Sequence, residues 1–401
     1  MVLAYGVNRL GTWFGTIALS LAVFDHTHSA LDVAAVLIAA QVVPAFVVPA
    51  VIARVEASRG RHELSALLYV EAVAIGAVAV LLSHFWLPGI LLLVAVDGTA
   101  ALAANALLRT ELAAAAKREV DDLGDPNAAE QQVNAVVNVA FSITFVAGPI
   151  LAGVTAAAAG AVVALLIDVA TFLICGTLLL DLHPHVEEAG GESVAKRLRA
   201  AWRHVRSVPS LRALLIAQGV GLIFFESAVP IEVAYAKRTL LSGDRGYGLL
   251  VTCWGVGVVL GSVIFARAGT RSLTAMLAGG TLAIGAGYLG FAAAPSLTVA
   301  AGAAVVGGIG NGVQYAPVIS SLQRLTPPEL HGRVMGLLES ISAVAPALGL
   351  ALGGALVAAG SPRLAFAVVG AGAAATSLAF TRVRFHDGGA AQGLATAEPA
   401  P

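Results

Sequence analysis

Three ionisable side chains, Arg9, Asp97 and Glu226, lie inside long apolar stretches of this sequence. A charged group within a membrane-spanning helix is costly, so each of these positions invites a functional hypothesis. A carboxyl group held away from water can bind and release a proton near neutral pH, which makes Glu226 and Asp97 candidate proton acceptors. Arg9 would then tune such a carboxyl or hold an anionic substrate. The alternative is a structural ion pair, Arg9 with Asp97 or Glu226, that holds helices in register.

Uncharged polar residues recur along the same stretches at near-facial spacing. Asn105 follows Asp97 by eight residues, and Gln218 precedes Glu226 by eight. These positions could line a polar cavity, for which the candidates are Arg9, Thr12, Thr16, Asn105, Gln218, Asn311 and Gln314.

Other ionisable residues within or beside apolar stretches are expected to have structural roles. Glu71 and Asp168 would face neighbouring helices, and Glu339 would pair with Arg333. Glu232 is expected near the outer face beside Lys237, whereas Asp25 and Asp32 flank an outer loop and are expected to be solvated.

The composition places these residues in an integral membrane protein. Of the 401 residues, 58% are hydrophobic and only 12% are charged, and the mean hydropathy is +0.87. A soluble domain carries roughly 25% charged residues, so this chain cannot cover a water-facing surface. The long, non-alternating apolar runs favour transmembrane helices over an outer-membrane barrel.

Spans of roughly 20 apolar residues, separated by short polar breaks, predict an all-α protein of about 12 transmembrane helices. The expected helices are residues 3–25, 31–53, 64–83, 87–108, 131–155, 160–181, 211–236, 246–267, 272–293, 297–320, 333–358 and 363–382. The segment 109–130 is expected to be a solvated connection.

A long polar connection near the middle divides the chain into two halves. The longest connection near the middle separates a six-helix half, residues 1–182, from a second half, residues 211–382, through a cytoplasmic linker at 183–210. Residues 383–401 are expected to form a disordered cytoplasmic tail. Most Lys and Arg residues fall on one side of this topology, so both termini are predicted to be cytoplasmic and the protein to lie in the cell membrane.

Several short motifs resemble the major facilitator superfamily, in particular its bacterial exporter-like branch. They are Arg9-Leu-Gly-Thr-Trp13, Asp25-His-Thr-His-Ser29, Gly148-Pro149-x3-Gly153, Gly246-Tyr-Gly-x6-Trp254-Gly-Val-Gly and Gly332-Arg333-Val-Met-Gly336. The resemblance implies two six-helix halves around a central cavity lined by spans 1, 4, 7 and 10. It also implies gating or packing roles for Gly148, Pro149 and Gly153.

The loop between spans two and three departs from the family pattern. It keeps Arg59-Gly60-Arg61, but Ala53 and Ala57 stand where the family has Gly and Asp. The cytoplasmic gating contact of the family is therefore in question for Arg59, Gly60 and Arg61.

The sequence offers no Gly-x4-Gly-Lys-Ser/Thr motif, no catalytic constellation and no set of convergent metal ligands. We therefore expect no enzyme activity, cofactor, metal or nucleic-acid partner. The predicted function is secondary active transport of a small molecule by a monomer in the lipid bilayer, as a proton-coupled exporter working by alternating access. The alternative is a non-transporting membrane sensor or assembly partner with the same fold.

Overall fold

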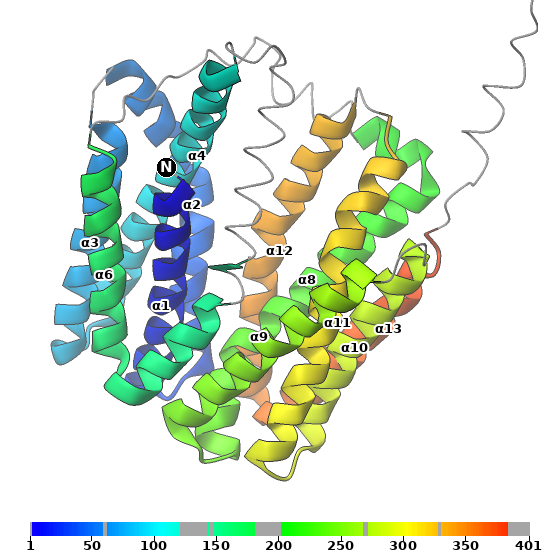
Figure 1. Cartoon of the computed structure of the whole chain (residues 1–401). Helices are drawn as coiled ribbons and strands as arrows, with labels where there is room; N and C mark the ends of the chain where they lie inside the picture. The colour runs from blue at the N-terminus through cyan, green and yellow to red at the C-terminus, as the bar shows by residue number, and fades with distance from the viewer. Residues whose placement is uncertain are drawn as a thin grey trace, which may run out of the picture.

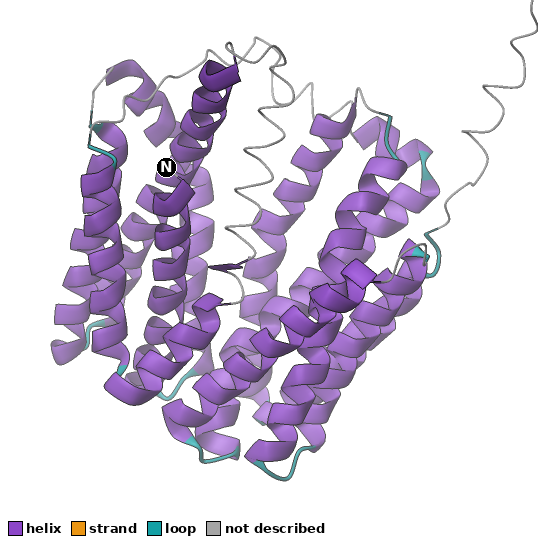
Figure 2. Cartoon of the chain, in the orientation of Figure 1, coloured by secondary structure: helices purple, strands orange, loops and turns teal. Residues whose placement is uncertain are grey.

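The computed structural model describes residues 2–58, 62–120, 143–144, 147–180, 202–267, 272–327 and 330–383. Throughout these ranges the ordered elements are helices joined by short loops (Figure 2). The expectation of an all-α protein is confirmed. Since lipid offers no hydrogen bonds to the backbone, helices that satisfy their own N–H and C=O groups are the expected solution.

The helices follow the predicted spans closely. They are α1 Val2–Thr27, α2 Ala30–Ser58, α3 Glu63–Leu81, α4 Leu87–Val120, α6 Ala161–Leu178, α8 Pro209–Ala234, α9 Gly243–Arg267, α10 Leu273–Ala293, α11 Leu297–Arg324, α12 His331–Ala359 and α13 Pro362–Phe380.

Eleven helices in the described ranges are long and apolar enough to cross a membrane. A further apolar helix, Ala147–Ala159, occupies the C-terminal part of the fifth predicted span. Most of the remainder of that span lies outside the described residues. The protein is thus a multi-pass membrane protein.

One predicted boundary is wrong. Helix α4 continues to Val120, although a connection was expected from residue 109. The stretch Glu111-Leu-Ala-Ala-Ala-Ala-Lys117 consists of strong helix formers, so the helix continues past the apolar span. Hydrophobicity marks where lipid ends, and it does not mark where a helix ends.

The helices pack as two groups (Figure 1). In one group α1 packs on α6, and α3 packs on both α4 and α6; in the other, α9 packs on α11, and α10 packs on both α11 and α13. Helix α2 of the first group packs along α12 of the second. Most of the predicted linker lies outside the described residues, but residues 202–207 are helical, and Val205 is buried against α8, α10 and α12.

Glycine pairs set the closest helix packing in the second group. Gly257 and Gly261 of α9 face Gly308 and Gly312 of α11. A Cβ atom added at Gly257 would lie 2.9 Å from the Cα of Gly308, so only glycine permits this approach. Small residues four apart allow such close contact between helices in a membrane.

We predict that Gly308→Ala destabilises the protein, because the new methyl group would collide with the backbone carbonyl of Trp254. Overpacking of this kind costs about 1–3 kcal/mol. The unfolding temperature in detergent should fall by several degrees, with a lower yield of monodisperse protein. Gly302→Ala on the same helix is the matched control, since its Cβ meets nothing within 4 Å. Equal behaviour of the two variants would contradict this account of the α9–α11 contact.

Candidate functional site

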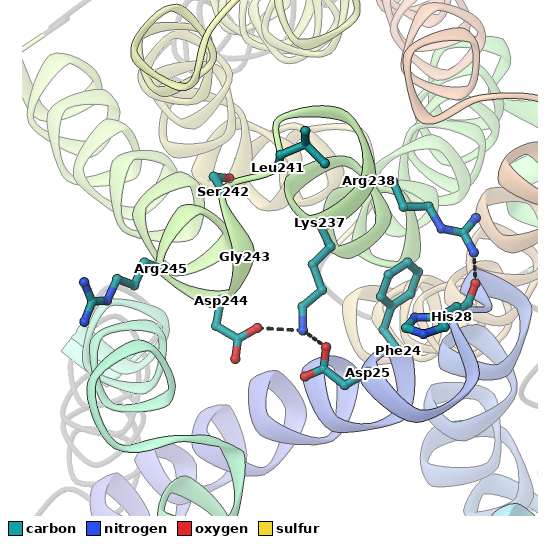
Figure 3. A pocket seen from close by; sticks show the side chains of 10 residues that line it. All are labelled: Phe24, Asp25, His28, Lys237, Arg238, Leu241, Ser242, Gly243, Asp244 and Arg245. Atoms are coloured by element: carbon teal, nitrogen blue, oxygen red, sulfur yellow. Dashed lines mark hydrogen bonds and ion pairs between the residues drawn. The ribbon is translucent and has the colours of Figure 1, made fainter.

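A three-residue ion-pair cluster joins the two helix groups at the end of the bundle where α1 ends. We call this end the Asp25 end. The Lys237 ammonium contacts the carboxylate of Asp25 on α1 and lies 2.6 Å from Oδ1 of Asp244 on α9 (Figure 3). The Lys237 side chain is 12% exposed, whereas that of Asp25 is 49% exposed. One cation therefore pairs with a carboxylate from each group, and its pair with Asp25 crosses the boundary between the groups.

Arg238 adds a second connection beside Lys237. Its Nη2 donates a hydrogen bond to the backbone carbonyl of His28, and its guanidinium lies 5.1 Å from the centre of the Phe24 ring. The C-terminus of a helix carries partial negative charge, so a cation is favourable there. Arg238 thus binds the C-terminal end of α1 through charge, a hydrogen bond and a cation–π contact.

The segment that carries both cations is shaped by its backbone. Helix α8 continues into a π-helical turn, Tyr235–Thr239, whose Tyr235 hydroxyl donates to the Phe291 carbonyl at 2.7 Å. Leu241 and Gly243 then adopt positive φ angles of 51° and 60°, which reverses the chain into α9. Non-glycine residues rarely adopt positive φ angles, so the backbone conformation of Leu241 is an unusual one that defines this turn.

A cavity of about 640 Å³ lies at this junction, beside the Lys237 ion pairs (Figure 3). Its walls come from the end of α1 and from the turn between α8 and α9. The charged residues that line it are Asp25, Lys237, Arg238, Asp244 and Arg245.

Two backbone contacts close the same region. A Cβ at Gly153, in the helix Ala147–Ala159, would lie 2.9 Å from the Cα of Gly248 on α9. A Cβ at Gly354 on α12 would lie 3.1 Å from the backbone oxygen of Ala30 on α2. The two helix groups therefore touch at the Asp25 end through glycine as well as through charge.

Three of the predicted site residues hold buried polar atoms that have no hydrogen-bond partner among the described residues. They are Oδ1 of Asp97, Oε1 of Gln218 and Nδ2 of Asn311. Buried polar groups are normally satisfied, so each of these atoms needs a ligand or a water molecule, and the Asp97 oxygen can alternatively take up a proton. Asp97 lies on α4, Gln218 on α8 and Asn311 on α11, in both helix groups.

Other predicted cavity residues hydrogen-bond within the helix bundle. The Thr12 and Thr16 hydroxyls donate to the carbonyls of Asn8 and Thr12, four residues earlier on α1. The Asn105 amide donates to the Ala101 carbonyl at 2.9 Å. Each of these side chains donates one hydrogen bond to a backbone carbonyl of its own helix. Its remaining acceptor or donor is then left for a ligand.

Gln314 is held by a neighbouring helix. Its Nε2 donates to Oγ1 of Thr281 on α10 at 3.0 Å, and Thr281 is 2% exposed. The structure thus places this amide in the contact between α10 and α11.

Glu226 and Arg9 are both half-buried, on α8 and α1. The Cβ atom of Glu226 packs against Gly349 of α12. The next residue towards the N-terminus, Phe225, begins an aromatic series in which Trp254 stacks on Tyr288 with ring centres 5.3 Å apart. Glu226 therefore lies at the edge of a rigid aromatic core.

The motif residues of spans one and five meet in the structure. A Cβ at Gly148 would collide with the indole of Trp13, so Gly148 makes room for this ring. Pro149 is buried beside it, and Gly153 forms the backbone contact with Gly248. The residues Arg59, Gly60 and Arg61 lie outside the described ranges.

Sequence reasoning missed the ion-pair cluster. Asp25 was expected to be simply solvated, and Lys237 was expected near Glu232, but Lys237 pairs with Asp25 and Asp244. Asp25 and Lys237 are 212 residues apart, so local spacing could not associate them. The available signal was that Lys237 and Arg238 are basic residues on the side of the topology that is otherwise poor in them.

The geometry defines a bundle of membrane helices in two groups, with polar sites between helices and charged contacts at one end. Its C-terminal half matches the family described as Major Facilitator Superfamily over residues 214–399. No curated protein matches the chain by sequence.

Solved transporter structures share the fold. A mutant of the nucleoside transporter NupG aligns with a TM-score of 0.72 at 11% identity, covering 95% of this chain and 99% of the other. An inward-facing bacterial homologue of the iron transporter ferroportin aligns at 0.68 and 16%, covering 94% and 96%. An inward-facing, unoccupied bacterial homologue of the human lysosomal transporter Spinster aligns at 0.66 and 13%, covering 96% and 97%.

The resemblance expected from the sequence motifs is confirmed by the family match and by the shared fold. The chain therefore has the fold of major facilitator transporters, and its residues 214–399 match the model of that family. At these identities the structural relatives establish the fold, and their own substrates do not carry over.

We predict that Lys237→Gln separates the two helix groups at the Asp25 end, because two carboxylates would lose their shared cation. Partly exposed ion pairs contribute up to about 1 kcal/mol each, so the ratio of open to closed molecules should rise roughly fivefold. Spin labels at Leu31→Cys and Leu364→Cys, both exposed leucines, report this opening by pulsed electron paramagnetic resonance. Cys175→Ser and Cys253→Ser provide the background without other thiols.

Arg245→Gln is the matched control for this measurement. Arg245 is exposed and lines the same cavity, but it takes no part in the ion pairs of Lys237. Its distance distribution should equal that of the parent protein. An unchanged distribution for Lys237→Gln would show that the Arg238 and glycine contacts hold this end closed without the Lys237 ion pair.

Proposed function

We propose that this protein is a proton-coupled secondary transporter that exports a small molecule by alternating access. The observation that carries the proposal is the closure of the Asp25 end by the cross-group ion pair of Lys237 with Asp25, the Arg238 hydrogen bond and the glycine contacts. In alternating access, one end of a central site is closed while the other is open, and the two halves rock between these states. The Asp25 end would be one of the two gates.

The positive-inside rule supports an orientation for this gate. It places both termini in the cytoplasm and the Asp25 end at the outer face of the cell membrane. The conformation described here then corresponds to an inward-facing state. Two relatives of the same fold are described as inward-facing, which agrees with this assignment.

The unpartnered atoms of Asp97, Gln218 and Asn311 support a polar central site. They comprise a carboxylate oxygen, an amide oxygen and an amide nitrogen, so they offer both acceptors and a donor. A polar solute that satisfies them would bind with less desolvation penalty than an apolar one. The division into halves at residues 1–182 and 211–382 and the monomeric state belong to the same proposal.

Glu226 and Asp97 are the proposed coupling groups. Each is a carboxyl on one of the four helices that would line the cavity, one in each half. Protonation of either group shifts the balance between the facing states only if the proton binds one state more tightly than the other. Export would follow if the inward-facing state binds substrate and the outward-facing state binds protons.

The test is proton-linked flux in energised inside-out vesicles, with an interior pH probe read while a panel of compounds is added. We expect substrate-dependent proton release from wild-type vesicles. Glu226→Gln or Asp97→Asn should reduce the release by at least about tenfold, since loss of a proton site removes coupling. Asp32→Asn is the control, because Asp32 lies at the first turn of α2, away from these helix centres.

Two outcomes would redirect the proposal. Release that both variants retain would place the coupling proton elsewhere in a working transporter. Absence of release and of solute flux across a broad panel would contradict the exporter and favour the non-transporting sensor.

A further inference from the structure

Three carboxyl groups converge within the first helix group: Glu71 on α3, Asp97 on α4 and Asp168 on α6. Helix α3, which carries Glu71, packs on both α4 and α6, the helices that carry Asp97 and Asp168. The three carboxyls are thus near enough for the charge of one to affect the others. Glu71 is ten residues from the end of α3, and Asp97 is ten residues from the start of α4. At 1.5 Å per residue each lies about 15 Å from the Asp25 end, near the middle of a hydrocarbon core about 30 Å thick.

Helix α1 is shaped to accommodate Asp168. Cβ atoms added at Gly11 and Gly15 would collide with the two carboxylate oxygens of Asp168. The two glycines are four residues apart, so they form one face of α1 turned towards α6. The Asp168 carboxyl therefore fits against bare backbone, in a space that a larger residue on α1 would remove.

Two of these carboxyls are almost fully buried, and Asp97 is half-buried. Glu71 is 1% exposed and Asp168 is 2% exposed. Both Oε atoms of Glu71, together with Oδ1 of Asp97 and Oδ1 of Asp168, lack a hydrogen-bond partner in the described part of the chain. An ionised carboxylate in such surroundings costs several kcal/mol unless a proton or a cation neutralises it.

An uncharged acceptor points into the same region from α1. Asn8, which is 3% exposed, lies one turn before Gly11 on the face turned to α6, and its Oδ1 has no partner among the described residues. The neighbouring Cys175 thiol of α6 donates to the Ala4 carbonyl at 3.3 Å. The cluster thus presents a second kind of oxygen that needs a donor.

Among the side chains that the structure describes on α1, α3, α4 and α6, the cations are too few to neutralise the cluster. Arg9 follows Asn8 on α1 and could offset one negative charge at most. Thr171 and Cys175 of α6 add a hydroxyl and a thiol, and neither is a cation. With three carboxyls and at most one arginine, at least two negative charges would remain in the core if all three ionised.

We propose that Glu71, Asp97 and Asp168, with Asn8, form an internal proton-binding site that holds at least two protons among its carboxyl groups. A protonated carboxyl becomes a hydrogen-bond donor, so it can satisfy a neighbouring carboxylate or the Asn8 oxygen. Like charges that share a site favour such proton sharing. Among the described residues no three ligands are gathered with the geometry of a metal site, which favours protons over a divalent ion.

This inference goes beyond the proposed function, because protons would occupy the site whether or not the protein moves a solute. It also places proton binding at α3 and α6, outside the four helices expected to line the cavity. Asp97 belongs to both groupings and would connect the buried site with the cavity. Movement of α4 against α3 would then change how tightly the protons are held.

The first test follows the unfolding temperature of the purified full-length protein between acidic and alkaline pH. Removal of the shared protons leaves buried, repelling carboxylates, so the wild-type protein should lose several degrees as the pH rises. The double variant Glu71→Gln, Asp168→Asn keeps the shape without the charge, and it should lose most of this pH dependence. Asp25→Asn with Asp244→Asn is the control pair, which should keep the dependence.

The second test distinguishes protons from another monovalent cation. The alkaline series is repeated with sodium or choline as the only cation. Equal curves support protons, whereas a sodium-specific rise would assign the site to Na⁺ and overturn the proposal. Infrared difference spectra between the two pH limits should show loss of protonated-carboxyl absorption in the wild type and a smaller loss in the double variant.

Each remaining outcome is decisive. A wild-type protein whose unfolding temperature and infrared spectrum are independent of pH would contradict the site. If the double variant fails to fold, Glu71→Gln alone carries the infrared test, and an unchanged signal would again overturn the proposal. Retained pH dependence with no solute flux would support this site while contradicting the proposed exporter.

Discussion

The lack of water in the bilayer core is the constraint on which this structure depends. It requires the backbone to satisfy itself, and the chain accordingly consists of long helices in the described ranges. The same constraint applies to polar side chains. Thr12 and Thr16, for example, donate hydrogen bonds to carbonyl groups of their own helix. Side chains that break this rule, such as Gln218 and Asn311, are therefore informative about ligands.

The helices could be predicted from sequence because hydrophobic length is a local property. The long, predominantly apolar stretches that contain Asp97 and Glu226 already show that both carboxyls lie in a span. The end of α4 was predicted less well, because helix propensity carries the helix past the lipid boundary to Val120. Local sequence thus predicts which segments cross the membrane better than it predicts the residue at which a helix ends.

The functional contacts could be predicted only in part, because they join distant segments. Spacing placed Glu71 and Asp168 on helices, but it gave no rotation about the helix axis, so their convergence with Asp97 was not foreseen. Gly11 and Gly15 held relevant information, since two small residues on one face indicate a close neighbour. That neighbour, Asp168 on α6, becomes evident only when the helices are packed.

The glycine contact between Gly153 and Gly248 has a mechanical consequence for the end that it closes. Two bare backbones have no interdigitated side chains to unlock, so they can part or slide with little steric resistance. The strength of the closure would then reside mainly in the charges of Lys237, Asp25 and Asp244. Charges that water can reach are weakened by mobile ions, over a Debye length of about 8 Å at physiological ionic strength. The balance between the closed and open forms would therefore respond to the salt concentration of the solution that bathes the Asp25 end.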